Sequence, residues 1–263
     1  MAIRVVVSGS GNMGRQVLAG VAGASDMEPV GVLEKFASSD AVTSTDGGSV
    51  PMSADIPSLL DQTKPDVIID FTNADWSPLV ADAALERGVR LVIGTSGLSE
   101  EWVDGLAARC HERSVGAVIA TNFAIGAVLM IHMAKIAARF FDAAEIIELH
   151  HDRKVDAPSG TALTTASEML AARGKPFERN VPEQETLPAT RAAAVDGITI
   201  HSVRLPGLVA HQEVLFGGLG QTLSIRHDTT GRESFIPGVL LATREVMRRK
   251  ELVRGLEALV GLA

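Results

Sequence analysis

Short apolar runs alternate with segments of helical spacing along residues 1–121. Residues 3–8 are apolar and largely β-branched, and apolar side chains then recur at Met13, Val17, Leu18 and Val21, as on one face of a helix. This reading predicts strands at 3–8, 29–33, 66–71, 90–93 and 115–120, and helices at 12–22, 76–87 and 99–112. Continuous apolar strands alternating with helices are typical of a parallel sheet covered on both faces. With right-handed crossovers, the pattern predicts a Rossmann-type doubly wound α/β sheet.

The pattern changes in the middle of the chain. A strongly apolar helix is expected at 124–141, followed by a strand, an irregular stretch up to Pro158 and a helix that starts at Ser159. A segment rich in proline, alanine and charge at 174–196 is expected to be extended or a loop. The other expected elements are strands at 145–150, 198–204, 212–216 and 221–227, and helices at 159–173, 235–249 and 251–262. These elements predict a second α+β domain with an open mixed sheet.

The composition excludes several functions. The 263 residues are 46% hydrophobic and 21% charged, which is ordinary for a globular chain. Acidic residues outnumber lysine and arginine by 32 to 24, and a net charge of −8 suits neither a nucleic-acid binder nor a protein held on anionic membranes. With no tyrosine and one cysteine, the sequence offers no tyrosine acid or base, no intrachain disulfide and no cysteine-rich metal site.

One uncharged run, the 21 residues 114–134, is long enough to raise the question of a membrane span. It contains Thr121, Asn122 and His132, and its first half is strand-like while its second half is helix-like. A buried strand, turn and helix are therefore expected. Residues 1–7 are expected to form the first strand of a domain, because their apolar stretch is too short for the core of a signal peptide. The expected compartment is the cytoplasm.

A glycine motif joins the first predicted strand to the first predicted helix. Gly9, Gly11 and Gly14 have the spacing GxGxxG, which allows a tight turn and lets a pyrophosphate approach the free N–H groups of the helix start. Glu34 ends the second predicted strand, 20 residues beyond Gly14, where a carboxylate accepts hydrogen bonds from an adenosine ribose. A merely tight turn is the alternative, but the complete strand–helix–strand context predicts a dinucleotide site.

The choice of dinucleotide stays open because of Lys35. Glu34 favours the free ribose hydroxyls of NAD, whereas Lys35 either binds the 2′-phosphate of NADP or is a solvated surface charge. Two further strand ends carry small or polar residues, at 94–97 and 120–123. Ligands of open α/β sheets bind at the carboxyl ends of the strands. Both segments are therefore expected near a nicotinamide ring.

Chemistry-bearing residues are densest at 148–162, ELHHDRKVDAPSGTA. Adjacent side chains of a strand point to opposite faces, so a regular strand presents only one of His150 and His151 to a cleft. Ser159 is a good N-cap, and the helix start behind it is suited to carboxylates or phosphates, with Lys154 as an additional cation. Histidine is the natural acid–base group near neutral pH. The alternatives are a plain capped helix and a metal site, the latter disfavoured because neighbouring histidines chelate poorly and no third ligand is evident.

This segment resembles the signature of the dihydrodipicolinate reductases. Similar motifs extend over nearly the whole chain, namely SGSGNMG, DVIIDFT, VIGTSG, ATNFAIG and HSVRLPGLVAHQEVLF. The resemblance implies metal-free hydride transfer from NADH or NADPH to the cyclic dicarboxylate 4-hydroxy-tetrahydrodipicolinate, giving tetrahydrodipicolinate in lysine and diaminopimelate biosynthesis. It also implies a homotetramer joined through the sheet of the second domain. The expected domains are a dinucleotide-binding domain at 1–121, a substrate-binding and oligomerisation domain at 122–233, and C-terminal helices at 234–263 that pack back on the first.

The resemblance also implies roles for individual residues. His150 is the expected proton donor and Lys154 the second catalytic cation, while Arg232 matches less closely an arginine near the active site. The expected contacts of the substrate are His151, Ser159, Gly160 and Thr161. The expected contacts of the cofactor are Ser8, Gly9, Ser10, Gly11, Asn12 and Met13 at the phosphates, Glu34 and Lys35 at the adenosine, and Gly94, Thr95, Ser96, Ala120, Thr121, Asn122 and Phe123 at the nicotinamide. Ser96 and Lys35 stand where relatives often carry threonine and arginine.

Three other functions share part of these features. Another Rossmann oxidoreductase, such as an amino-acid or semialdehyde dehydrogenase, would share the first domain but not the segment 148–162, and a semialdehyde enzyme would want a cysteine in its cleft. Cys110 lies in a predicted helix away from every motif and is expected to have a packing role. A non-catalytic dinucleotide sensor would have no use for His150 and Lys154. A related reductase of another cyclic imine is compatible with the sequence.

Overall fold

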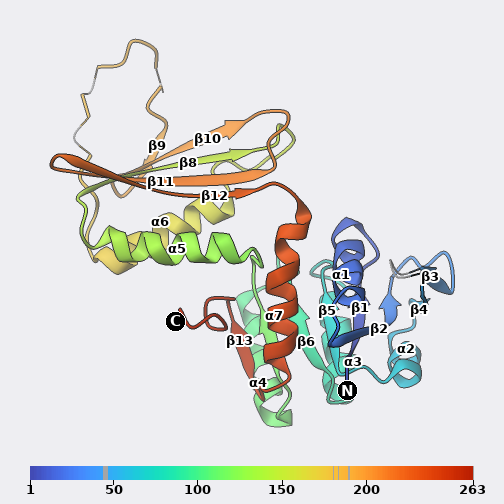
Figure 1. Cartoon of the computed structure of the whole chain (residues 1–263). Helices are drawn as coiled ribbons and strands as arrows, with labels where there is room; N and C mark the ends of the chain where they lie inside the picture. Colours follow the sequence, from blue (N-terminus) through green and yellow to red (C-terminus); the bar gives the residue numbers. More distant parts are fainter. Residues whose placement is uncertain (44–46, 180, 183, 189, 263) are drawn as a thin grey trace. The chain divides into compact units, whose positions relative to one another are not determined.

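The computed structural model describes residues 1–43, 47–179, 181–182, 184–188 and 190–262 (Figure 1). Residue 263, the last of the predicted C-terminal segment, and residues 180, 183 and 189 of the predicted segment 174–196 lie outside the described residues. The chain divides into two compact units, one made of Met1–Ile125 with Arg232–Ala263 and the other of Gly126–Gly231.

A largely parallel sheet forms the centre of the first unit. Its strand order is β13-β7-β6-β5-β1-β2-β4-β3, and β3 pairs antiparallel with β4 at one edge. The strands are β1 (Ile3–Ser8), β2 (Met27–Leu33), β3 (Ala41–Thr43), β4 (Ser49–Ser53), β5 (Val67–Asp70), β6 (Arg90–Ile93), β7 (Ala117–Ile119) and β13 (Leu252–Arg254). The chain order reverses between β1 and β5, both of which run parallel to their neighbours. This is the doubly wound topology predicted from the sequence.

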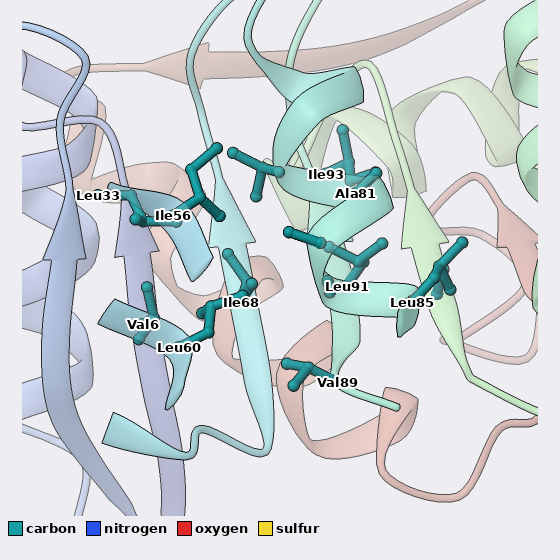
Figure 2. Close-up of a cluster of buried hydrophobic side chains, with 14 of the residues drawn as sticks. Val6, Leu33, Ile56, Leu60, Ile68, Ala81, Leu85, Val89, Leu91 and Ile93 are labelled. Carbon is teal, nitrogen blue, oxygen red and sulfur yellow. The ribbon is translucent and has the colours of Figure 1, made fainter. Parts of the chain in front are cut away.

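Helices cover this sheet and bury its apolar residues. They are α1 (Asn12–Ala22), α2 (Ile56–Thr63), α3 (Ser77–Glu86), α4 (Glu100–Arg113) and α7 (Ile236–Val246), with the 3-10 helix η1 (Arg232–Phe235) before α7. One core cluster joins Leu60 of α2 and Leu85 of α3 to Val6, Ile68 and Leu91 of the sheet (Figure 2). Each such buried side chain contributes about 1.5–3 kcal/mol. This packed core therefore holds in place the strand ends that carry the predicted cofactor contacts.

The second unit has the open mixed sheet predicted from the sequence. Its strand order is β12-β11-β8-β10-β9, and β8 runs parallel to β10 but antiparallel to β11. The elements are α5 (Ile125–Ala138), β8 (Ala143–His150), α6 (Gly160–Arg173), β9 (Ala193–Val195), β10 (Ile198–Arg204), β11 (Ala210–Gly218) and β12 (Gln221–Thr229). Ala144 and Ile146 of β8 pack in a core with α5 and α6, whereas Glu145 and Ile147 are half-buried on the other face. Figure 1 shows both helices on the same side of the sheet.

The prediction of a helix at 251–262 is wrong. Leu252–Arg254 forms β13, which pairs in parallel with β7, and Gly255 follows with a φ of 80°, which no α-helix contains. The pairing satisfies the N–H and C=O groups of a strand that would otherwise be an edge, and this tertiary gain outweighs the local helical spacing. The sequence pattern predicts no element at β3, β4 or α2, and β9 lies in the segment 174–196 that is expected to be extended or a loop, because such short elements carry too little periodicity.

The other predicted elements are present, with limits that differ by a few residues. Four of them coincide with the structure, at 3–8, 12–22, 90–93 and 198–204. The uncharged run 114–134 forms β7 and most of α5, as predicted. Among the described residues, no helix combines the length and apolarity that a membrane crossing requires.

Candidate active site

The glycine motif forms the turn between β1 and α1. Gly9 has a φ of 102°, and a Cβ on Gly14 would lie 1.8 Å from the carbonyl oxygen of Gly9, so both positions require glycine. Gly11 is the N-cap residue of α1 and has no side chain to bond to the first turn. The turn therefore presents N–H donors and the positive end of the helix dipole to a ligand. Of the expected phosphate contacts, Gly11 and Asn12 are exposed, Gly9, Ser10 and Met13 are half-buried, and Ser8 is buried.

Glu34 is bonded to the glycine turn. Its Oε2 accepts hydrogen bonds from the N–H and the hydroxyl of Ser10 at 2.8 and 2.7 Å, and its Oε1 accepts one from the N–H of Phe36 at 3.2 Å. Burial raises the pKa of Glu34, but the hydrogen bonds from Ser10 and Phe36 outweigh it and hold the pKa below its ordinary value. Lys35 is exposed, with its Nζ 5.7 Å from the centroid of the Phe36 ring. An ionised acceptor and an exposed cation thus stand side by side.

A cavity of about 230 Å³ lies beside this turn in the first unit. Its lining residues are Gly9, Ser10, Gly14, Arg15, Leu18, Val32, Ser38, Ser39, Val42 and Met52. The β3–β4 segment, which the sequence pattern does not predict, supplies Val42 and Met52. Arg15, Ser38 and Ser39 add a cation and two hydroxyls that were not among the expected contacts. The apolar walls, the donors and the uncapped helix start fit the adenosine and phosphate parts of a dinucleotide.

The hydroxyl of Thr95, an expected nicotinamide contact, forms hydrogen bonds with other residues of the first unit. It donates to Asp70 Oδ2 at 2.9 Å and accepts from the Thr72 N–H at 3.0 Å and the Ser77 hydroxyl at 2.8 Å. Thr95 is 5% exposed and Asp70 is 1% exposed. The Thr95 side chain therefore fixes the end of β6, and only the backbone of this residue is left to face a ligand.

Aromatic rings pack closely at two of the other expected nicotinamide contacts, Gly94 and Phe123. A Cβ on Gly94 would lie 2.1 Å from the ring of Phe71, which packs against Phe123 with ring centroids 5.4 Å apart. Of the expected residues here, Ser96 and Thr121 are exposed, Asn122 is half-buried, and Ala120 and Phe123 are buried. The polar side chains at the ends of β6 and β7 are thus accessible, while the apolar ones build the wall behind them.

In the second unit, the signature segment begins at the end of β8. His150 is the last residue of the strand and His151 lies just beyond it, so the backbone becomes irregular where the sequence predicted. The Nδ1 of His150 lies 2.5 Å from Oε2 of Glu148, whose side chain is fully buried. Arg204 of β10, the register partner of His150, donates to both oxygens of this carboxylate at 2.9 and 2.8 Å. Glu148 and Arg204 are not among the site residues predicted from the sequence, although a two-residue spacing puts Glu148 on the strand face of His150.

The pKa of His150 lies below its ordinary value. Burial is the largest cause, and the cations Lys154 and Arg204 act in the same direction. The hydrogen bond and charge of Glu148 oppose this lowering without reversing it. In the free protein, His150 is therefore a largely neutral imidazole at pH 7.

The start of α6 is open, as the sequence predicted. The hydroxyl of Ser159 accepts a hydrogen bond from the Ala162 N–H at 3.2 Å, and the Ser159 N–H donates to Oε1 of Glu148 at 3.2 Å. Gly160 is exposed and a Cβ there would meet nothing within 4 Å, while Thr161 is half-buried. The first turn of this helix therefore has N–H groups and space to receive a carboxylate.

Lys154 is placed by an ion pair. Its Nζ lies 2.7 Å from Oδ1 of Asp156, and its side chain is 23% exposed. The Nδ1 of His151 is buried and finds no hydrogen-bond partner among the described residues.

Arg232, the expected arginine near the active site, is the first residue of η1 in the first unit. The structure therefore brings His150, Lys154 and the α6 start together in one unit.

The fold and these two sites define a Rossmann-type oxidoreductase. The first unit has the glycine turn, the ionised Glu34 and the cavity of a dinucleotide site, and the second combines an imidazole, an ammonium group and an open helix start. The chain belongs to the dihydrodipicolinate reductase family: the family model of the N-terminus matches residues 3–123, and that of the C-terminus matches 126–260. The predicted family and fold class are confirmed.

Similar proteins support the same family. A 4-hydroxy-tetrahydrodipicolinate reductase of Dehalococcoides mccartyi is 50% identical over 99% of both chains. One of Moorella thermoacetica is 47% identical over 98% of both. A solved structure of dipicolinate-bound dihydrodipicolinate reductase from Paenisporosarcina sp. TG-14 has a TM-score of 0.89 and 42% identity, covering 98% of this chain and 99% of that one. An amine dehydrogenase from Mycobacterium smegmatis, with a TM-score of 0.65 and 16% identity, shares the fold.

Proposed function

We propose that this chain is a 4-hydroxy-tetrahydrodipicolinate reductase that uses NADH or NADPH. The observation that carries the proposal is the signature segment, in which His150, Lys154 and the Ser159-capped start of α6 lie in one unit. Replacement of the 4-hydroxyl group by hydrogen consumes one hydride and one proton and releases water. The site has to bind a dianionic ring and deliver that proton.

The cofactor supplies the hydride when it is bound. The turn Ser8, Gly9, Ser10, Gly11, Asn12 and Met13 is proposed to hold its phosphates, Glu34 and Lys35 its adenosine end, and Gly94, Thr95, Ser96, Ala120, Thr121, Asn122 and Phe123 its nicotinamide. The support is the uncapped start of α1, the ionised Glu34 and the cavity lined by the same turn. Thr95 takes part through its backbone, since its hydroxyl is already bonded to Asp70.

The chain's own groups bind the substrate and move the proton. The N–H groups of Gly160 and Thr161, with the hydroxyl of Ser159 as a further donor, receive one carboxylate, and Lys154 and His151 bind the dianion further. His150 delivers the proton, and a bound dianion favours its protonated form because opposite charge raises the pKa of an imidazole. Substrate binding therefore opposes the lowering of the His150 pKa by burial and favours the charged imidazole that donates the proton.

Assembly and location are further parts of the proposal. The open face of the second sheet carries half-buried Ile147, Leu149 and Leu215 among the ion pairs Glu145–His201 and Glu213–Arg226, a mixed surface that a homotetramer would cover. Light scattering should give four chains per particle, and Leu215→Arg should dissociate them; a monomeric parent protein would reject this proposal. We place the enzyme in the cytoplasm, where a lone cysteine stays reduced.

The experiment that tests the function follows the loss of reduced-nicotinamide absorbance with freshly made substrate. His150→Gln should lower kcat by about 10²–10⁴-fold with cofactor affinity unchanged, because it removes a general acid. Lys154→Ala should lower kcat and also raise the KM of the substrate. His132→Gln, on α5, is the control and should behave as the parent. A parent protein without substrate-dependent oxidation of NADH or NADPH would overturn the proposal.

A second variant tests the carboxylate site. Gly160→Val puts a branched side chain into the open space at the start of α6. It should raise the KM of the substrate while calorimetric titration with NADH stays unchanged. Loss of NADH affinity together with substrate affinity would mean that this segment supports the fold.

A further inference from the structure

Glu148 is a fully buried carboxylate with a partner on every side. Its Oε2 accepts from Nδ1 of His150 at 2.5 Å and from Nη1 of Arg204 at 2.9 Å. Its Oε1 accepts from Nη2 of Arg204 at 2.8 Å and from the Ser159 N–H at 3.2 Å. A buried charge is tolerated only where it is paired and hydrogen-bonded in this way.

Glu148 is ionised in this setting. Burial raises the pKa of its carboxyl, but the hydrogen bond from Arg204 and those from Ser202 and His150 outweigh it, so the pKa lies below its ordinary value. An ionised carboxylate accepts hydrogen bonds and donates none. The Nδ1 of His150 must therefore be the donor and carry a hydrogen.

We propose that Glu148, held by Arg204, is a positioning residue that locks His150 in the Nδ1–H tautomer and leaves Nε2 as the atom that takes up and delivers the proton. The inference rests on the proposed function, in which His150 is the proton donor. Beyond that function, the proposal specifies which ring nitrogen of His150 reacts and which residues select it.

The same carboxylate ties the imidazole to the rest of the site. Nη2 of Arg204 also donates to the carbonyl oxygen of Asp156 at 2.6 Å, and the Asp156 side chain is the partner of Lys154. The Ser159 N–H, at the cap of α6, donates to Glu148 directly. The ion pair between buried Glu148 and half-buried Arg204 thus connects the proton donor, the catalytic cation and the helix start. Among the described residues, the charged groups that shift the pKa of His150 are Glu148 on its own strand, Arg204 on β10, and Lys154 in the loop after β8.

The tautomer of the parent protein is a direct test that needs no catalysis. Nitrogen-15 NMR of protein labelled in histidine distinguishes a protonated from an unprotonated ring nitrogen, and His150→Gln identifies the signals. At a pH where His150 is neutral, we expect Nδ1 protonated and Nε2 unprotonated. The reverse assignment would overturn the proposal, whether or not the chain proves to be the proposed reductase.

Glu148→Gln tests the consequence for catalysis. The amide keeps the shape of the carboxylate, but turning its NH₂ group toward His150 favours the Nε2–H tautomer, as the corresponding Asp→Asn change does in a serine-protease triad. We expect kcat to fall about 10²–10⁴-fold, the KM of NADH to stay within about threefold, and the ring nitrogen signals to exchange roles. Glu168→Gln, which removes an exposed ion-paired carboxylate on α6, is the matched control and should retain parental kcat.

Two conservative variants cover the case in which Glu148→Gln does not fold. Glu148→Asp keeps an acceptor-only carboxylate and should keep the Nδ1–H tautomer with a smaller loss of kcat. Arg204→Lys keeps the charge but not the two-pronged bond, and should lower kcat and shift the acid limb of its pH profile while NADH still binds. A folded Glu148→Gln protein with parental kcat, or one that loses kcat with the tautomer unchanged, contradicts positioning by Glu148. A parent protein without activity contradicts only the proposed function.

Discussion

Two glycines of the same turn should respond differently to the same substitution. A Cβ on Gly14 would lie 1.8 Å from the carbonyl oxygen of Gly9, and real Cβ atoms essentially never approach closer than 3.0 Å. Gly14→Ala therefore has to move α1 away from β1 by about 1.2 Å, the difference between these distances. A Cβ on Gly11 meets nothing within 4 Å, and the φ of −69° and ψ of −170° there suit alanine.

The two substitutions differ in expected stability. Overpacking against a backbone atom costs about 1–3 kcal/mol, of which the better helix propensity of alanine returns about 0.5–1 kcal/mol. We expect Gly14→Ala to lower the free energy of unfolding by about 1–2 kcal/mol, which is a fall of about 2–8 °C in Tm for a chain of this size. Gly11→Ala should leave the Tm nearly unchanged, because the restriction of the unfolded chain by alanine is offset by its poorer fit at the N-cap of α1. It should still weaken NADH binding, since its methyl group stands at the uncapped helix start.

Thermal unfolding and calorimetric titration with NADH separate the two effects. Gly14→Ala should lose stability and NADH affinity together, whereas Gly11→Ala should lose affinity alone. A Tm of Gly14→Ala equal to that of the parent would refute the close contact between the turn and the helix. Parental NADH affinity in Gly11→Ala would refute phosphate binding at this turn.

Four shorter predictions follow from the same structure. Lys35→Ala should weaken NADPH more than NADH in steady-state assays; equal effects would make Lys35 a surface charge. Thr95→Val should lower the free energy of unfolding by about 1–3 kcal/mol in urea, because it leaves buried hydrogen-bonding groups without a partner, with NADH affinity nearly parental. Cys110, whose pKa burial raises to about 11, should react with a thiol reagent at pH 8 only after unfolding. The pKa of His150 is lowered in the folded protein, so its neutral state favours folding above the ordinary value of 6.5, and this contribution should fade on acidification below it in NMR and unfolding titrations.

The interior of the first sheet was predictable because local pattern and tertiary role coincide there. Strands such as β1 and β6 are buried on both faces, so nearly every residue is apolar and the run is visible in the sequence alone. The edge strand β13 is different. Its partner β7 lies more than a hundred residues earlier in the chain, and nothing in the pattern of residues 251–262 indicates that pairing. Helical spacing was the stronger local signal, and it was misleading.

In the candidate site, too, the residues fixed by local sequence were predictable and those brought in by strand pairing were not. Gly9 and Gly14 were predictable as glycines because the backbone of one turn dictates them locally, and the placement of Ser159 follows from its role as a helix cap. Arg204 lies 56 residues from Glu148 and reaches it only because β10 pairs with β8. A sequence motif therefore reveals the residues that react, because the chemistry restricts their types. It does not reveal the residues that position them, because strand pairing brings these residues to the site. For this reason the tautomer of His150 could be inferred only after the register of β8 and β10 was known.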